Sequence, residues 1–230
     1  MMFRRAIALA LLLGVKPVLA ADITLVTEEY PPFNMRDEGR IAGEVTDLLR
    51  KVFVEAGLSY SLEMLPWARA IARAEAEPGT CVFSTTRTPE RETRFSWVGP
   101  LADNDWVLLA AKDSPIVLQS LKDARPYVIG GYVGDAQAQE LQSRGFRVEL
   151  TAQNALNPVK LEHGRIDLWA CGARSGAFMA AQSGVHGLRQ VLSYKRVELS
   201  LACNKETAPA MVERLRGALS AVRAQAEKRP

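Results

Sequence analysis

A short segment of the chain concentrates the charged side chains best suited to gripping an anion. Arg87, Arg91 and Arg94 occur within eight residues, together with Glu90 and Glu92. A planar guanidinium can make two parallel, charge-assisted hydrogen bonds to one carboxylate, so an arginine here could hold a carboxylate-bearing ligand. The same composition also suits a solvated turn in which arginines and glutamates form surface ion pairs. Both interpretations are open on these residues alone.

Catalytic chemistry has much less support from the residue types. His163 and His186 are the only imidazole bases, and neither is near a candidate nucleophile in the sequence. The three cysteines allow at most one disulfide, in three alternative pairings, and none has CxxC or metal-ligand spacing. We therefore expect no catalytic residues, no metal and no cofactor.

The elements that must position these side chains begin as an alternation of strands and helices. Residues 23–27 form a short apolar run typical of a buried strand. Residues 45–56 carry one apolar stripe at helical spacing, and residues 58–64 alternate apolar and polar side chains as a strand does. A helix over residues 67–77 and a strand over residues 81–84 complete a β-α-β-α-β series. This order predicts a mostly parallel sheet covered by helices.

A second, similar series follows a predicted loop over residues 87–100. It starts with a strand at 106–111 and continues with alternating strands and helices at 127–133, 135–144, 146–150, 157–162 and 166–170. The tail adds a strand at 197–203 and an amphipathic helix at 208–228. Two α/β units of roughly 100 residues each fit the usual size of small domains.

The formal net charge of +3 comes from one end of the chain. Arg4 and Arg5 precede an apolar run over residues 6–15, and Val18 and Ala20 are small residues at the positions that a signal peptidase reads. The apolar run has about half of the roughly 20 residues that span a bilayer. We therefore predict a cleaved signal peptide over residues 1–20.

The predicted mature chain is formally neutral. The first twenty residues contain three bases and no acid, which leaves 26 basic against 26 acidic residues. No basic stripe, zinc pattern or recognised nucleic-acid motif remains, so we expect no nucleic-acid partner. An exported, soluble protein of the periplasm is the prediction, and export permits a disulfide.

Several motifs together resemble those of the bacterial extracellular solute-binding proteins, family 3, the polar amino acid type. The resemblance covers nearly all of residues 22–228, and the order and spacing of its motifs make it specific. The motifs are EYPPF at 29–33, GEVTDLL at 43–49, PW at 66–67, TRTPER at 86–91, and GRID at 164–167.

The resemblance implies the two-lobed, type II periplasmic-binding-protein-like α/β fold, with a cleft between the lobes. Lobe 1 would combine residues 21–103 and 197–230, and lobe 2 would be residues 104–196. Two segments near residues 102–106 and 193–198 would connect them. The implied function is capture of a small polar, carboxylate-bearing molecule, an amino acid or related organic acid, by lobe closure. Delivery to an ABC transporter permease would follow, with the protein a monomer.

Two alternative functions stay open beside transport. The same fold could sense a ligand for a membrane signalling receptor. It could also carry dehydratase-like enzyme chemistry, for which Glu28 and Glu90 are the available acids or bases. The missing constellation of a nucleophile and a base argues against an enzyme.

Residues of the first lobe match the ligand positions of the family. Arg91 matches the arginine that grips a ligand carboxylate, and Thr86 and Thr88 flank it with hydroxyl or backbone donors. Tyr30 and Trp67 match positions where aromatic faces surround the ligand. Turn formation by the threonines and ordinary core packing by the aromatic residues are the alternatives.

Further candidates lie at the far end of the ligand and in the second lobe. Glu28 would contact the end of the ligand remote from Arg91, or be a solvated carboxylate at a strand end. Tyr132 and the helix start at residues 134–136 fall where the family brings backbone N–H groups to the ligand, although Asp135 also suits a plain helix cap.

One departure from the family bears on the ligand. Amino acid binders of this type carry an aspartate for the α-ammonium where this chain has Gly172. Because a buried ammonium without a partner is costly, a ligand with a carboxylate and no ammonium becomes a candidate beside the amino acids, and Arg174 nearby would repel a cation further. The family's sheet order also places Cys81 beside Cys203, which makes them the expected disulfide.

Overall fold

The computed structural model describes residues 22–228, and the predicted signal peptide lies outside this range. None of the helices in this range is long and apolar enough to cross a membrane. The helices are α1 (Glu44–Ala56), α2 (Trp67–Ala76), α3 (Pro89–Glu92), α4 (Ala136–Ser143), α5 (Asn157–Glu162), α6 (Ala173–Gln182) and α7 (Pro209–Glu227), with 3-10 turns η1 (Leu121–Ala124) and η2 (Asn154–Leu156).

The core of the fold is one eight-stranded sheet in the order β4-β1-β5-β10-β6-β9-β7-β8. Its strands are β1 (Ile23–Thr27), β4 (Tyr60–Met64), β5 (Thr80–Thr86), β6 (Phe95–Ala110), β7 (Val128–Tyr132), β8 (Arg147–Thr151), β9 (Leu168–Gly172) and β10 (Arg189–Asn204). A separate hairpin joins β2 (Met35–Asp37) to β3 (Arg40–Ala42). The predicted mixed α/β architecture is confirmed, since β1 pairs in parallel with both β4 and β5.

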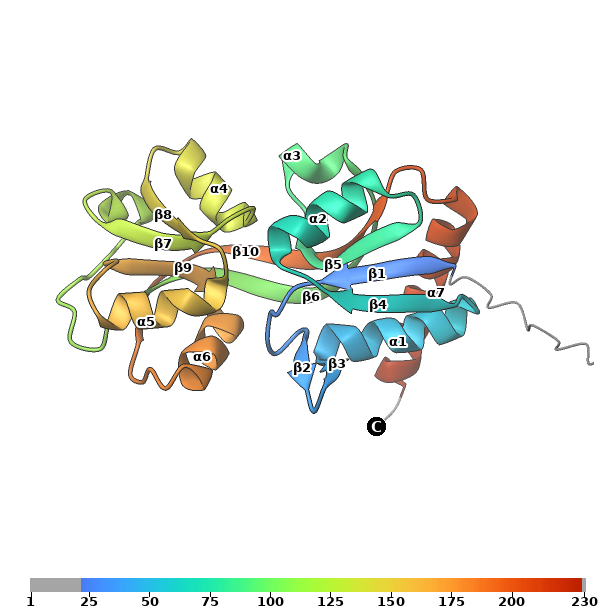
Figure 1. The fold of residues 1–230 in the computed structure, drawn as a ribbon, viewed down its shortest axis with the longest axis horizontal. Helices are drawn as coiled ribbons and strands as arrows, with labels where there is room; N and C mark the ends of the chain where they lie inside the picture. Colours follow the sequence, from blue (N-terminus) through green and yellow to red (C-terminus); the bar gives the residue numbers. More distant parts are fainter. Residues whose placement is uncertain (1–21, 229–230) are drawn as a thin grey trace, which may run out of the picture.

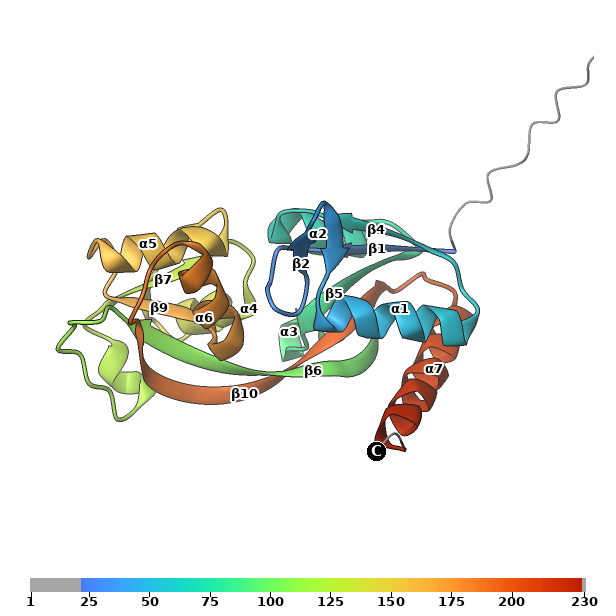
Figure 2. The ribbon, with the colours of Figure 1, turned by 90° about the horizontal axis from the view of Figure 1, so that it is seen from below.

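Two long antiparallel strands, β6 and β10, run through the whole molecule (Figure 1). We call β1, β4, β5, α1, α2, α3 and α7 the first group, and β7, β8, β9, α4, α5 and α6 the second group. Figure 2 shows β6 and β10 curving side by side from one group to the other. In the second group, α4 covers one face of the sheet and α5 and α6 cover the other (Figure 1).

The strands predicted at 106–111 and 197–203 were too short, because β6 and β10 each begin earlier in the chain. The segment 87–100 is not a loop, because it contains α3 and the first residues of β6. The predicted strands at 106–111 and 197–203 are parts of β6 and β10. Gly99 and Pro100 lie inside β6, and a proline within a run argues against a strand on sequence alone. β6 tolerates them because its ladder with β10 shifts register between Leu199 and Leu201.

Local patterns explain the first group well. The predicted apolar stripe of α1 is buried, with Val45, Leu49, Val52 and Phe53 almost inaccessible to solvent. Gly57 follows the stripe and ends this helix in the left-handed conformation, which glycine adopts readily. Burial of this stripe, rather than intrinsic helix propensity, stabilises α1 in place.

The predicted disulfide is confirmed. Cys81 on β5 and Cys203 on β10 are direct cross-strand partners with Cα atoms 3.8 Å apart. Cys171, the third cysteine, is a buried free thiol. The bridge ties β5, which leads to the arginine segment, to a strand that serves both groups.

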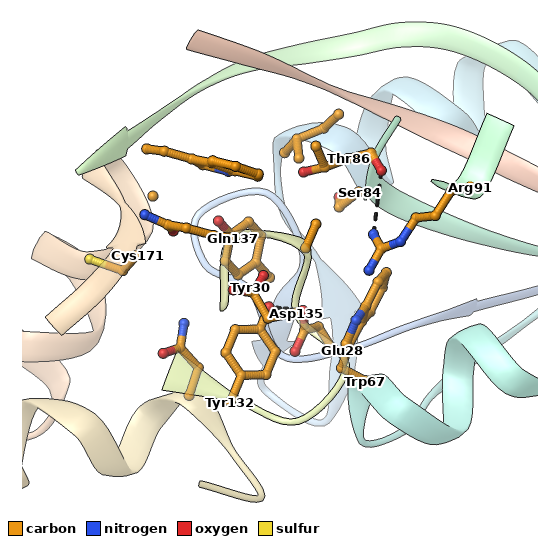
Figure 3. Close-up of a pocket in the computed structure, with 15 residues that line it drawn as sticks. Glu28, Tyr30, Trp67, Ser84, Thr86, Arg91, Tyr132, Asp135, Gln137 and Cys171 are labelled. Atoms are coloured by element: carbon orange, nitrogen blue, oxygen red, sulfur yellow. Dashed lines mark hydrogen bonds between the residues drawn. The ribbon is translucent and has the colours of Figure 1, made fainter. Parts of the chain in front are cut away.

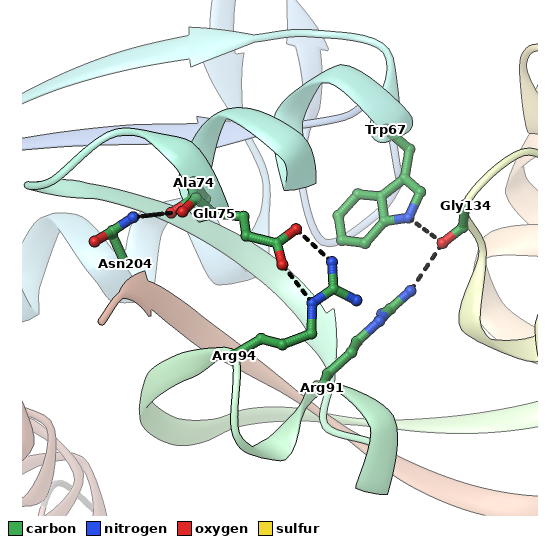
Figure 4. Close-up of polar contacts among 7 residues, drawn as sticks. All are labelled: Trp67, Ala74, Glu75, Arg91, Arg94, Gly134 and Asn204. Atoms are coloured by element: carbon green, nitrogen blue, oxygen red, sulfur yellow. Dashed lines mark hydrogen bonds and ion pairs between the residues drawn. The ribbon is translucent and has the colours of Figure 1, made fainter. Parts of the chain in front are cut away.

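Helix α2 is held at both ends, which fixes the aromatic side chain at its start (Figure 4). At the carboxyl end, Asn204 Nδ2 donates to the carbonyl oxygens of Ala74 and Glu75 at 3.0 and 2.7 Å. At the amino end, Trp67 Nε1 donates to the Gly134 carbonyl oxygen of the second group at 2.8 Å. The Trp67 ring is therefore set between the two groups.

Candidate functional site

A small cavity lies between the two groups, where strands from both end. Residues at or just after the carboxyl ends of β1, β5, β7 and β9 contribute to it, which is where open α/β sheets generally bind ligands. Figure 3 shows Arg91, Trp67 and Thr86 on one side and Gln137 and Cys171 on the other. The lining residues are Glu28, Tyr30, Trp67, Ser84, Thr86, Arg91, Trp106, Tyr132, Asp135, Ala136, Gln137, Asn154, Cys171, Gly172 and Leu199.

The structure brings together most of the residues selected from the sequence. Seven of them line this cavity, although they are far apart along the chain: Glu28, Tyr30, Trp67, Thr86, Arg91, Tyr132 and Gly172. Thr88 does not line it and instead borders a separate hollow beside α3 and α4. Its predicted place at the ligand is therefore not supported by the geometry.

The arginine segment divides into one buried residue and two surface residues. Arg87 pairs with Glu92, and Arg94 pairs with Glu75, all at the surface. Arg91 is only 3% exposed and has no carboxylate partner among residues 22–228. The surface salt-bridging interpretation thus applies to Arg87 and Arg94 and not to Arg91.

Arg91 makes contacts to backbone carbonyl oxygens. It donates to the Thr86 oxygen at 3.3 Å and to the Gly134 oxygen of the second group at 2.8 Å. Its guanidinium lies over the Trp67 ring, 5.5 Å from the centroid. Burial lowers the pKa of Arg91, because a charged group loses hydration in this environment. Arg91 therefore places a positive charge in the cavity. Its direct hydrogen-bond partners are neutral carbonyl oxygens and not a carboxylate.

Two acids approach the same space. Glu28 is 9% exposed and accepts a hydrogen bond from the Tyr132 hydroxyl at 2.8 Å across the two groups. Burial raises the pKa of Glu28 to about 8, and the hydrogen bond from Tyr132 opposes the shift only in part. Asp135 caps α4 by accepting from the Ala138 N–H at 2.8 Å, so the cap interpretation is confirmed. Burial raises the pKa of Asp135 as well.

The missing aspartate at Gly172 has a steric explanation. A Cβ atom at this position would lie 2.3 Å from Asn104 Oδ1 and 2.6 Å from the Tyr30 hydroxyl. Asn104 Nδ2 donates to that hydroxyl at 3.1 Å, so the two side chains occupy the space together. Arg174 does not line the cavity, because it pairs with Glu44 at the surface.

Sequence reasoning missed several residues of the site. Ser84 ends the apolar run of β5 with φ of 57°, a left-handed conformation uncommon for a serine, and it lines the cavity. Asn104 and Asn154 are buried amides without a recognisable motif. Trp106 was assigned to a strand only, and nothing in the sequence indicated that it would face this space.

The cavity has a volume of about 20 Å³, which is room for roughly one water molecule. A second hollow of about 250 Å³ adjoins it and shares Glu28, Trp67 and Asn154 as lining residues. Binding sites for small molecules usually measure about 300–1,000 Å³. A ligand of amino acid size therefore requires the contacts across the groups, at Gly134 and between Glu28 and Tyr132, to separate.

Within residues 22–228, no group of three or more His, Cys, Asp or Glu could hold a metal ion. His163 and His186 are both absent from the cavity lining. The arrangement can hold polar and charged groups of a ligand through Arg91, the acids and the amides.

The family model of the bacterial extracellular solute-binding proteins, family 3, matches residues 23–228. The chain belongs to this family. The resemblance carried by its motifs is thereby confirmed, and a binding protein rather than an enzyme is indicated. No curated protein sequence matches this chain.

Solved structures share the fold of this chain at low sequence identity. A mutant of arginine-bound ArgBP from T. maritima has a TM-score of 0.77 at 19% identity, covering 87% of this chain and 96% of that one. The arginine-, lysine-, histidine-binding protein ArtJ from Geobacillus stearothermophilus has a TM-score of 0.79 at 19% identity, covering 90% and 91%. A histidine kinase sensor domain with similarity to periplasmic binding proteins has a TM-score of 0.83 at 18% identity, covering 90% and 92%. The chain therefore has the fold of periplasmic amino-acid-binding proteins.

Proposed function

We propose that this protein captures a small, carboxylate-bearing solute between its two groups and delivers it to an ABC transporter permease. The observation that carries the proposal is Arg91, a nearly inaccessible guanidinium without an acidic partner among residues 22–228, placed at the carboxyl ends of the strands. A ligand carboxylate would replace neutral carbonyl oxygens with a charge-assisted, two-pronged contact.

The proposed working motion separates and closes the two groups about β6 and β10. In this proposal the lobes are residues 21–103 with 197–230, and residues 104–196. In the structure, Arg91 and Trp67 both donate to the Gly134 oxygen across the groups. A bound solute would take over these donors, so that closure is stabilised by ligand contacts in place of protein contacts.

The proposed ligand site comprises Arg91, Trp67, Tyr30, Thr86, Tyr132 and Glu28, with Gly172 leaving space for Tyr30. Because no carboxylate stands at residue 172, the proposed ligand lacks an α-ammonium or presents it elsewhere. The proposed location is the periplasm, after cleavage behind Ala20, and N-terminal sequencing of the exported protein tests the cleavage directly.

The test begins with native mass spectrometry of protein purified from its own cell envelope, which reveals a bound mass. Thermal unfolding with amino acids, organic acids and polyamines then measures stabilisation by ligand, which rises with ligand concentration. Arg91→Met should abolish the shift given by the bound solute, whereas Arg94→Met, which removes a surface arginine of the same segment, should keep it. The proposal fails if no mass copurifies and no compound raises the melting temperature.

The sensor alternative has one supporting observation, the likeness of the fold to a histidine kinase sensor domain. Deleting the gene separates the two roles. Loss of uptake of the bound solute indicates transport, and loss of a transcriptional response with uptake intact indicates sensing. Recovery of the bound solute chemically unchanged after prolonged incubation excludes turnover by an enzyme.

A further inference from the structure

Asn154 presents a buried amide whose orientation is fixed by its neighbours. It lies at the start of η2 and is 4% exposed. Its Oδ1 accepts from Trp169 Nε1 at 2.9 Å and from Asn157 Nδ2 at 3.2 Å. An indole N–H can only donate, so the oxygen of Asn154 must face Trp169 and the NH₂ group must face away.

The NH₂ group of Asn154 is left without a hydrogen-bond partner within residues 22–228. A buried donor that lacks an acceptor destabilises a fold, so such groups are rare and usually have a functional reason. Asn154 lines the cavity that holds Arg91 and also lines the adjoining hollow, to which Arg91 does not contribute. Asn154 therefore borders both spaces, including the hollow that Arg91 does not reach.

We propose that Asn154 is a specificity-determining residue, and that Nδ2 donates to a carbonyl-type oxygen at the end of the solute remote from Arg91. The inference rests on the proposed function. The solute would thus carry a carboxylate at one end and a second oxygen acceptor, a carboxamide or another carboxylate, at the other. Glu28 and Trp67, which also border both spaces, flank the chain that connects these two ends.

The charges around Asn154 match this chemistry. The adjoining hollow is lined by Glu28, Glu29 and Arg36. Burial raises the pKa of Glu28 to about 8, so its carboxyl is mostly protonated at neutral pH. One acid and one base remain charged, and the hollow does not select strongly for a net charge. The direction of the hydrogen bond selects instead, because an N–H donor repels an ammonium and attracts an oxygen lone pair. A solute ending in an amine or in a methyl group should bind worse than one ending in a carbonyl oxygen.

A matched series of probes tests the proposal by calorimetry. The probes are succinate, glutarate and adipate, the ω-monoamide of each, the straight-chain monocarboxylates of equal length, and the corresponding ω-amino acids. At the length that binds best, the diacid or the monoamide should bind roughly tenfold tighter than both the monocarboxylate and the amino acid. The diacid and monoamide arms distinguish the two sources of the oxygen acceptor.

The second test replaces the NH₂ donor of Asn154 with a carboxylate acceptor. Asn154→Asp keeps an oxygen for Trp169 and Asn157 but removes the NH₂ group. It should weaken the diacid and the monoamide roughly tenfold and reverse the preference toward the ω-amino acid. Gln142→Glu makes the same exchange of amide for carboxylate at an exposed position on α4 and should leave the ratios unchanged.

A measurement on the unaltered protein avoids any folding defect of the variant. With ¹⁵N-labelled protein, the side-chain NH₂ resonances of Asn154 should shift on adding the monoamide or the diacid. Probes that bind with equal affinity whatever their far end would overturn the inference, while their dependence on Arg91 would keep the proposed function. Failure of every diacid and monoamide to bind at millimolar concentration, while another solute copurifies, also overturns the inference alone.

Discussion

Replacing Gly172 with alanine tests the geometry at the centre of the site. The backbone of Gly172 has φ of −73° and ψ of 139°, which alanine adopts freely, so any cost must come from the added methyl group. That carbon would lie 2.3 Å from Asn104 Oδ1 and 2.6 Å from the Tyr30 hydroxyl. Ordinary contact begins near 3.4 Å, so Asn104 would have to retreat by about 1 Å.

The expected cost follows from overpacking and from one lost hydrogen bond. Inserting a carbon into a filled interior typically costs about 1–3 kcal/mol. Moving Asn104 also weakens its hydrogen bond to the Tyr30 hydroxyl, which contributes about 1 kcal/mol. Part of the strain disappears when Asn104 is truncated, so Gly172→Ala should cost at least about 1 kcal/mol less in an Asn104→Ala background.

Urea unfolding of the four proteins in this double-mutant cycle measures the coupling. Gly217→Ala is the control, because a Cβ atom there meets no atom within 4 Å and the residue lies inside α7. The control should stabilise the protein by about 0.5–1 kcal/mol. A Gly172→Ala protein as stable as the parent, or strictly additive effects with Asn104→Ala, would refute the steric account of the missing aspartate.

Three further predictions concern stability. Replacing Cys81 and Cys203 by serine should cost up to about 5 kcal/mol in urea unfolding, because the bridge closes a separation of 122 residues, and the stability of that variant should not change further with a reducing agent. Cys171→Ser leaves the bridge intact, so a reducing agent should still destabilise that protein. The pKa of Glu28 rises from 4.5 to about 8 on folding, so the protonated carboxyl favours the folded state, and stability should fall by about 3–5 kcal/mol as pH rises from 4.5 to 8. Glu28→Gln should flatten that profile in thermal melts, and an unchanged slope would contradict the assignment. Asn204→Leu should cost about 2–3 kcal/mol by leaving two carbonyl oxygens at the end of α2 without their donor, and equal urea midpoints would exclude this role.

The spacing of apolar residues predicted those helices and strands that bury only one face. The α1 stripe and the alternation in β4 follow from contacts within a few residues, so the sequence places both elements closely. The long strands β6 and β10 are different, since each is stabilised by the other across about 100 residues of chain. Gly99 and Pro100 interrupt the pattern of β6, and only pairing with β10 keeps the chain extended there.

The candidate site was predictable where the family motifs carry it. Seven residues chosen from the motifs and from the missing aspartate line a single cavity. Each lies at or after the carboxyl end of a strand, and the alternation of strands and helices already places these ends at one edge of the sheet. Asn104, Ser84 and Asn154 were missed. Their importance comes from partners distant in the sequence, and an isolated asparagine or serine gives no local signal of burial.

By itself, the sequence determined the family and the alternation of strands and helices, and the resemblance to the family implied the pairing of Cys81 with Cys203. It also placed three arginines in one segment. Only the tertiary structure decided among them, because burial and partner choice depend on what packs from elsewhere in the chain. Arg87 and Arg94 find glutamates at the surface, whereas α2 and the Gly134 loop enclose Arg91 and leave its charge to neutral oxygens. That difference in environment makes one arginine of three the candidate for binding.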